Sequence, residues 1–233
     1  AKVLVDCSGS MAGDSMEAAK RALQGIVNGL TESDRISLSR FGTTVEHRSR
    51  GFWGGTRQVK GSATRWVDNL KADLGGTEME AALRSTIELA DGQQGDILLI
   101  TDGEINTIDE VLQTASDSRH RVFVVAIGAS PAEVHLSRLA VETGGHCDFV
   151  APGEDVEPAV LRMSARMRSV RALVTRIEWP AGLKLHWQQA MPSYVFENDE
   201  FSVCAVSSAL GQEVPFEVKL WGQLEGHPSE VLL

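Results

Sequence analysis

Short apolar runs alternate with amphipathic stretches along the first 168 residues of the chain. An apolar run of about four to eight residues bounded by turn residues has the length of a buried strand, and the stretches between these runs are long enough for helices. Such alternation is typical of βα units, which build a parallel sheet. Strands are predicted at Lys2 to Asp6, Arg35 to Phe41, Thr44 to Arg48, Asp96 to Thr101, Arg121 to Ile127 and His146 to Val150.

The second and third of these strands are separated only by Gly42 and Thr43. Two residues can join antiparallel strands, but they are far too few for the crossover that parallel strands need. The third strand is therefore expected to lie antiparallel at an edge. The predicted fold class is α/β, with a doubly wound, mostly parallel sheet that carries one antiparallel edge strand.

The stretch after Gly13 and Asp14 has apolar residues at spacings of three and four, which places them on one face of a helix. Further helices with similar apolar stripes are predicted along the same part of the chain, and each stripe is expected to face the core. They lie near Ser62 to Ala72, Glu78 to Ala90, Ile108 to Ser116, Ala132 to Glu142 and Val156 to Met167.

The pattern changes at about residue 169, where no helical period persists and a proline or glycine occurs every several residues. Runs rich in β-branched and aromatic residues between such breaks indicate short antiparallel strands. The chain is therefore predicted to divide into an α/β domain, residues 1–168, and a β-rich segment, residues 169–233. We expect this segment to be part of a β-sandwich completed by missing parts of a longer parent protein. Its strands are predicted at Val170 to Trp179, Leu183 to Trp187, Phe201 to Val206 and Val214 to Trp221.

The formal net charge is -10 over 233 residues, which argues against a general nucleic-acid binder because phosphates require a basic face. A metal ion or a cationic ligand suits this charge better. No apolar run reaches the roughly 18 residues of a membrane-spanning helix, so membrane insertion is not expected for this fragment. The three cysteines, Cys7, Cys147 and Cys204, are widely spaced, which fits buried thiols better than a disulfide framework.

Asp6 ends the first predicted strand, and Ser8 and Ser10 follow at alternate positions of the next turn. Open α/β sheets bind ligands beyond the carboxyl ends of their strands. A spacing of two sends these side chains to the same side of an extended turn, and Gly9 allows the backbone to bend there. Three oxygen ligands are therefore expected to converge.

Two other turns offer matching groups, a hydroxyl in Gly75-Gly76-Thr77 and a carboxylate in Thr101-Asp102-Gly103. Ligands that are all oxygen select a hard cation, and a small octahedral site that keeps several waters suits Mg²⁺. Mn²⁺ is an alternative, and Ca²⁺ is less suited because it favours more carboxylates. The predicted metal ligands are Asp6, Ser8, Ser10, Thr77 and Asp102.

The D-x-S-x-S pattern, the Gly-Gly-Thr turn and the Thr-Asp-Gly turn resemble, in this order, the metal-ion-dependent adhesion site of von Willebrand factor A domains. The resemblance covers roughly residues 1–168 and implies the Rossmann-like fold of that family. Within the family the chain is most similar to the group of inter-alpha-trypsin inhibitor heavy chains and von Willebrand A domain-containing protein 5A. This closer likeness is carried by Asp6 to Met11, Phe41-Gly42, Ala72 to Glu78, Thr101 to Glu104 and Arg176 to Pro180.

The resemblance implies that Ser8, Ser10 and Thr77 contact the metal directly or nearly so, while Asp6 and Asp102 often act through water. Because neutral hydroxyls leave the cation much of its charge, an Asp or Glu of a protein partner can complete its shell. The expected function is a non-enzymatic adhesion or scaffold module that binds a protein through Mg²⁺. Free thiols and the likeness to an intracellular member favour the cytoplasm, although secreted relatives are equally familiar.

Three other interpretations stay open at this stage. The metal could staple the strand-end loops of a structural module whose interaction surface lies elsewhere, for example on the β-rich segment. The turn from Asp6 to Ser10 could simply cap the first helix. A haloacid-dehalogenase-like phosphatase also places an Asp after its first strand, but its chemistry needs an acid two residues later, where this chain has Ser8.

Overall fold

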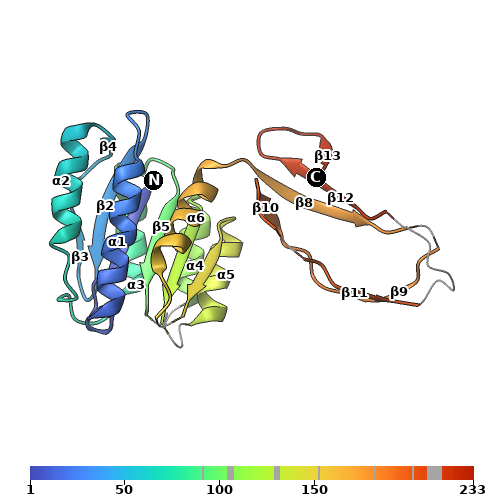
Figure 1. Cartoon of the computed structure of the whole chain (residues 1–233), viewed down its shortest axis with the longest axis horizontal. Coiled ribbons are helices and arrows are strands. Elements are labelled where there is room, and N and C mark those ends of the chain that lie inside the picture. Colours follow the sequence, from blue (N-terminus) through green and yellow to red (C-terminus); the bar gives the residue numbers. More distant parts are fainter. Residues whose placement is uncertain are drawn as a thin grey trace. The chain divides into compact units, whose positions relative to one another are not determined.

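The computed structural model describes residues 1–90, 92–103, 108–128, 132–151, 153–180, 182–200, 202–208 and 217–233. These residues form two compact units, Ala1–Met167 and Arg168–Leu233, and most of their helices and strands are labelled in Figure 1. None of the described helices combines the length and the apolar character that crossing a bilayer requires.

A seven-stranded sheet forms the centre of the first unit, in the order β3-β2-β1-β5-β6-β7, with β4 also paired to β2. β3 and β4 are antiparallel to β2, and the other pairs are parallel. The predicted fold class is therefore confirmed, and the two-residue β4 is an addition that the sequence pattern did not predict. The strands are β1 (Lys2–Asp6), β2 (Arg35–Phe41), β3 (Val45–His47), β4 (Trp53–Gly54), β5 (Ile97–Thr101), β6 (Val122–Ile127) and β7 (Cys147–Val150).

β1 lies near the middle of this sheet, and its register aligns the strand ends that matter for function. Asp6 pairs with Phe41 of β2, and Val5 pairs with Ile100 of β5, so Asp6 and Thr101 end neighbouring strands at the same edge. β1, β5 and β6 are buried along their whole length. Strands covered by helices on both faces have this continuous apolar character.

Helices cover both faces of the sheet, as a doubly wound arrangement requires (Figure 1). α3, α4 and α5 contribute Leu83, Val111 and Leu139 to one buried cluster with the strands. α1 packs against α2, and a Cβ on its Gly25 would contact Leu161 of α6. The helices are the 3-10 helix η1 (Gly9–Met11), α1 (Asp14–Gly29), α2 (Arg57–Asp68), α3 (Met79–Glu88), α4 (Ile108–Asp117), α5 (Glu133–Glu142) and α6 (Val156–Arg168).

The predicted boundaries are wrong for α2. The prediction started this helix near Ser62, whereas it begins at Arg57 because Thr56 acts as its N-cap. The Thr56 hydroxyl accepts a hydrogen bond from the backbone N–H of Val59 at 3.4 Å. The first turn is polar, so the apolar stripe behind the prediction begins only later in the helix. The helix also ends earlier than predicted, at Asp68.

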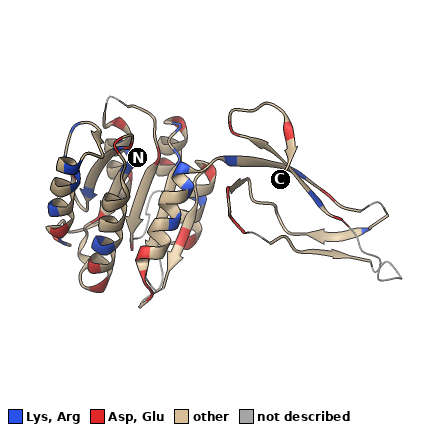
Figure 2. Cartoon of the chain, turned by 45° about the horizontal axis from the view of Figure 1, so that its top comes forward, with Lys and Arg blue, Asp and Glu red and all other residues tan. Residues whose placement is uncertain are grey.

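Acidic and basic residues are interspersed along the helices of the first unit (Figure 2). Neighbouring turns place opposite charges together, as in the pair of Lys20 with Glu17 at 2.8 Å and of Arg138 with Glu142 at 2.7 Å. Exposed pairs of this kind contribute little stability each. They indicate solvated helix surfaces.

The second unit contains a four-stranded antiparallel sheet in the order β10-β8-β12-β13 and a two-stranded antiparallel sheet of β11 and β9. This confirms the predicted β-rich segment; the completion of a sandwich by other parts of a parent stays a prediction. Phe201 and residues 209–216, which include parts of two predicted strands, lie outside the described residues. The strands are β8 (Arg171–Glu178), β9 (Leu185–Gln188), β10 (Tyr194–Phe196), β11 (Ala205–Ser207), β12 (Lys219–Leu224) and β13 (Glu230–Leu232).

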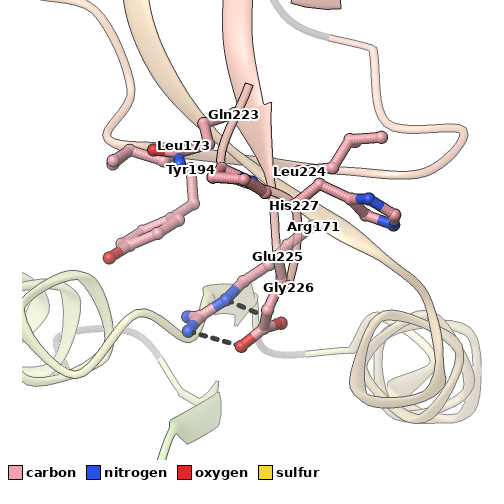
Figure 3. Close-up of a pocket in the computed structure, with 9 residues that line it drawn as sticks. Arg171, Leu173, Tyr194, Gln223, Leu224, Glu225, Gly226 and His227 are labelled. Carbon is pink, nitrogen blue, oxygen red and sulfur yellow. Dashed lines mark hydrogen bonds and ion pairs between the residues drawn. The ribbon is translucent and has the colours of Figure 1, made fainter. Parts of the chain in front are cut away.

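A pocket of about 370 Å³ opens on the four-stranded sheet of this unit (Figure 3). The Arg171 guanidinium lies 4.4 Å from the ring centroid of Tyr194 and pairs with Glu225 at 3.1 Å. Both charges are therefore compensated within the pocket wall. These contacts tie β8 to β10 and to the turn after β12, which is a structural role.

Candidate metal centre

The Asp6 carboxylate is the buried base of a polar cluster at the carboxyl edge of the first unit's sheet, and its side chain is fully shielded from solvent. Its Oδ1 accepts a hydrogen bond from the backbone N–H of Ser8 at 2.8 Å. Its Oδ2 accepts one from the Thr101 hydroxyl at 2.6 Å. Both oxygens are therefore held in fixed directions by β5 and by the turn that follows β1.

Ser8, Ser10 and Asp102 form a chain of hydrogen bonds above this base. The two serine hydroxyl oxygens lie 3.0 Å apart, and the Ser10 hydroxyl donates to Asp102 Oδ1 at 2.8 Å. Ser8 is buried, Asp102 is half-buried and Ser10 is exposed. The cluster is consequently closed towards the sheet and open towards solvent.

Thr77 approaches the cluster from the turn between α2 and α3. The backbone N–H of Gly9 donates to the carbonyl of Gly75 at 2.8 Å, which joins this turn to the one after β1. A Cβ placed on Gly103 would stand 3.1 Å from both Asp6 Oδ2 and the Thr77 methyl carbon. The structure therefore brings together the three turns in which the five metal ligands were predicted.

Thr101 is a residue of this cluster to which the sequence analysis gave no role of its own. It is fully buried, and besides donating to Asp6 its hydroxyl accepts a hydrogen bond from the backbone N–H of Gly103 at 2.9 Å. One hydroxyl thus fixes a carboxylate and shapes the turn that carries Asp102. In the sequence, the sign of this role was a polar residue at the end of an otherwise apolar strand.

The electrostatics of the cluster favour a cation. Partial burial and the negative charge of Asp6 raise the pKa of the Asp102 carboxyl, although the hydrogen bond from Ser10 acts in the opposite sense. Bringing a positive ion between the two carboxylates would offset their repulsion. The Cys7 thiol lies between two predicted ligands in sequence, but burial raises its pKa to about 12, so it stays protonated.

The donor set fits a hard metal ion. Two carboxylates and three hydroxyls supply only oxygen atoms, which are the ligands of Mg²⁺ rather than of softer metals. The described part of the chain holds no group of three or more His, Cys, Asp or Glu residues that could bind a metal. A metal centre here therefore depends on the hydroxyls of Ser8, Ser10 and Thr77.

Residues 2–149 match the family described as the von Willebrand factor type A domain. The chain belongs to this family. It is 28% identical over 167 residues to a von Willebrand factor A domain-containing protein of Dictyostelium discoideum, which covers 69% of the chain and 18% of that protein. It is 25% identical over 181 residues to human von Willebrand factor A domain-containing protein 5B1, which covers 76% of the chain and 15% of that protein. The chain thus spans less than a fifth of the length of either relative.

Two solved structures show a similar fold. A von Willebrand factor type A protein from Catenulispora acidiphila superposes with a TM-score of 0.63 at 17% identity, covering 99% of this chain and 63% of that one. Proximal thread matrix protein 1 from the mussel byssus, in a structure described as having a zinc-occupied metal-ion-dependent adhesion site motif, gives a TM-score of 0.55 at 14% identity. That match covers 71% of this chain and 44% of the mussel protein.

Proposed function

We propose that this von Willebrand factor A domain binds Mg²⁺ through Asp6, Ser8, Ser10, Thr77 and Asp102 and uses the ion to recognise a protein partner. Support comes from the oxygen-only donor set and from the meeting of three separate turns at one edge of the sheet. The mussel protein of similar fold, whose motif is described as occupied by zinc, supports the proposal of a divalent ion in this chain. Mg²⁺ is favoured over zinc here because the described ligands include neither cysteine nor histidine.

The observation that carries the proposal is the gradient of exposure across the cluster. Asp6 is fully buried and Ser8 is 2% exposed, whereas Ser10 is open to solvent. An ion held from below by these groups would keep a coordination position on its solvent side. Since hydroxyls do not neutralise the ion, an incoming Asp or Glu from a partner would gain a charge-assisted bond there.

The alternative to a receptor role is a structural metal that only holds the three turns together. Partner binding would then lie elsewhere, for example on the β-rich unit. The turns are already joined without an ion by the bonds from Gly9 to Gly75 and from Ser10 to Asp102. A staple would therefore add little order to them, which favours the receptor role. The two roles differ in whether a coordination position on the ion exchanges with solvent.

The phosphatase alternative is weakened by the surroundings of Asp6. A nucleophilic carboxylate must reach the substrate, yet both Asp6 oxygens accept hydrogen bonds and the side chain is fully buried. Ser8, at the position of the required acid, cannot protonate a leaving group as a carboxylic acid would. A non-enzymatic binding module is therefore the preferred function.

The wider placement of the protein is also part of the proposal. The segments from Asp6 to Met11 and from Ala72 to Glu78 support membership in the group of inter-alpha-trypsin inhibitor heavy chains and related intracellular proteins. The free thiols of Cys7, Cys147 and Cys204 favour a cytoplasmic location. The partner would be a protein, or another part of the parent chain, that presents an acidic side chain.

Calorimetric titration of Mg²⁺ tests the proposal. Wild type should bind one ion, and Asp6→Ala and Asp102→Ala should lose that binding. Asp117→Ala is the matched control, because Asp117 lies at the end of α4, where it accepts a hydrogen bond from Gln113, and belongs to none of the three turns. Equal Mg²⁺ binding by wild type and the three variants, or no Mg²⁺ binding by wild type, would contradict the proposed site.

A further inference from the structure

The turn that carries Thr77 is held on its outer side by the hairpin turn between β2 and β3. The backbone N–H of Thr43 donates to the carbonyl of Leu74 at 2.7 Å, and the Thr43 hydroxyl accepts a hydrogen bond from the backbone N–H of Gly76 at 2.8 Å. The backbone N–H of Glu78 donates to the carbonyl of Gly42 at 3.0 Å. Three hydrogen bonds thus connect two hairpin residues to the segment of residues 74–78.

The fit between the hairpin turn and this segment is close. A Cβ on Gly42 would stand 2.5 Å from both the Cβ and the carbonyl oxygen of Leu74, which no side chain can occupy. Gly75 has φ +78°, and a Cβ there would stand 2.8 Å from the Thr43 hydroxyl oxygen. Glycine is therefore required at both positions for the two turns to meet.

The inner side of the same segment contacts the turn after β1. The backbone N–H of Leu74 donates to the carbonyl of Cys7 at 3.0 Å, in addition to the bond from Gly9 to Gly75. Arg40 of β2 further pairs with Asp73, directly before the segment, at 3.0 Å. The Thr77 turn is consequently held between the Asp6 turn and the hairpin, so its position depends on both.

Thr43 itself does not belong to the core. Its side chain is exposed, whereas the neighbouring Gly42 is buried. A change at Thr43 that keeps its shape would therefore leave the packing intact and remove only the acceptor for the N–H of Gly76. Gly76 is bonded directly to Thr77, so a fixed Gly76 backbone also fixes the start of the Thr77 residue.

We infer that Thr43 is a positioning residue for the metal centre, which it affects by fixing the peptide of Gly76 and thereby the direction of the Thr77 hydroxyl. This inference rests on the proposed metal-binding function. Partners that orient metal ligands from outside the ligand set change metal affinity by about 10–100-fold when they are removed. Thr43→Val, which keeps the branched shape without the hydroxyl, is expected to weaken Mg²⁺ binding by that factor.

Two comparisons separate positioning from a general structural role. Thr43→Ser retains the hydroxyl and should restore the affinity of wild type. In a Thr77→Ala background the mutation Thr43→Val should have no further effect on Mg²⁺ binding, because the group that it orients is already absent. Thermal unfolding of the metal-free proteins should be the same for wild type, Thr43→Val and Thr43→Ser.

The calorimetric titration gives a distinct result for each failure. Wild-type affinity in Thr43→Val, an equal loss in the Thr77→Ala background, or a loss that Thr43→Ser does not restore would each overturn the inference while leaving the metal site in place. Absence of Mg²⁺ binding by wild type would instead overturn the proposed function, and the inference with it.

Discussion

The hydroxyl of Ser10 donates a 2.8 Å hydrogen bond to Asp102 Oδ1, across 92 positions of sequence. Ser10 belongs to the turn after β1 and Asp102 to the turn after β5. These strands are neighbours in the sheet, and parallel pairing brings their carboxyl ends to one edge. The position of the proposed metal centre is therefore a consequence of strand order combined with the small polar residues that follow each strand.

Replacement of Ser10 by Ala should separate metal binding from folding. Because Ser10 is exposed, the free energy of unfolding of the metal-free protein should change by less than about 0.5 kcal/mol. Mg²⁺ affinity should fall by at least about tenfold, since even residues outside the ligand set change metal affinity by that much. Chemical denaturation and calorimetry measure the two effects. A stability loss without an affinity loss would show that the hydroxyl is structural.

Thr101→Val should weaken both folding and metal binding. The change leaves buried Asp6 Oδ2 without its donor and the N–H of Gly103 without its acceptor. Leaving one such buried group unpaired costs about 1–3 kcal/mol, so the loss of both bonds should lower the unfolding free energy by about 2–6 kcal/mol. Thr101→Ser keeps the hydroxyl and serves as the control in urea denaturation. A loss in Thr101→Ser as large as the loss in Thr101→Val would contradict this expectation, because Thr101→Ser removes only the methyl group and keeps both hydrogen bonds.

Gly103→Ala should reduce Mg²⁺ affinity by crowding the centre. The added Cβ would stand 3.1 Å from Asp6 Oδ2 and from the Thr77 methyl carbon, and 3.2 Å from the Thr101 hydroxyl oxygen. Asp6 and Thr101 are held by hydrogen bonds, so each neighbour would have to shift by a few tenths of an ångström against these bonds. Overpacking of this kind costs typically about 1–3 kcal/mol. Unchanged metal affinity and stability would show that the turns are looser than the structure indicates.

Asp148 of β7 should contribute stability that disappears in acid. Partial burial opposes its ionisation, but a hydrogen bond from His146 and the charges of Arg166 and Arg162 prevail and hold its pKa at about 2. Because the folded pKa lies below the unfolded value of about 3.9, this contribution is complete above that value and is lost as the pH falls towards 2.

The variant Asp148→Asn tests this expectation. At neutral pH it should be less stable than wild type by about 1–2 kcal/mol, and the difference should shrink as the pH falls from about 4 to about 2. Thermal unfolding as a function of pH measures the difference. A stability gap that stays constant through this range would show that the ion pairs contribute nothing and that another effect of the substitution dominates.

The fold and the meeting of the three turns could be predicted because the signals are local. Buried parallel strands such as β5 are apolar along most of their length, Asp6 is the last residue of β1, and Asp102 directly follows β5. Elements whose stability depends on distant partners could not be predicted in this way. The two-residue β4 exists because Trp53 pairs with Ile36, and short β10 exists because it pairs with β8.

The residues that orient the proposed metal ligands could not be predicted from the sequence pattern either. Thr101 acts through a hydrogen bond to a residue 95 positions away, and Thr43 through one to a residue 33 positions away. Neither has a distinctive spacing, because loop packing rather than periodicity brings each to its partner. The α2 start was different, since the capping signal at Thr56 was present in the sequence but outweighed by the apolar stripe.

Water-proton relaxation of the protein loaded with Mn²⁺ tests the open coordination position most directly, since the paramagnetic ion reports whether bound water exchanges with solvent. Strong relaxation enhancement is expected in wild type and none in Asp102→Ala. A short peptide containing one Glu should lower the enhancement, while the same peptide with Gln should not. Bound Mn²⁺ without exchangeable water, or equal responses to the two peptides, would contradict an open coordination position and favour a metal that only joins the turns.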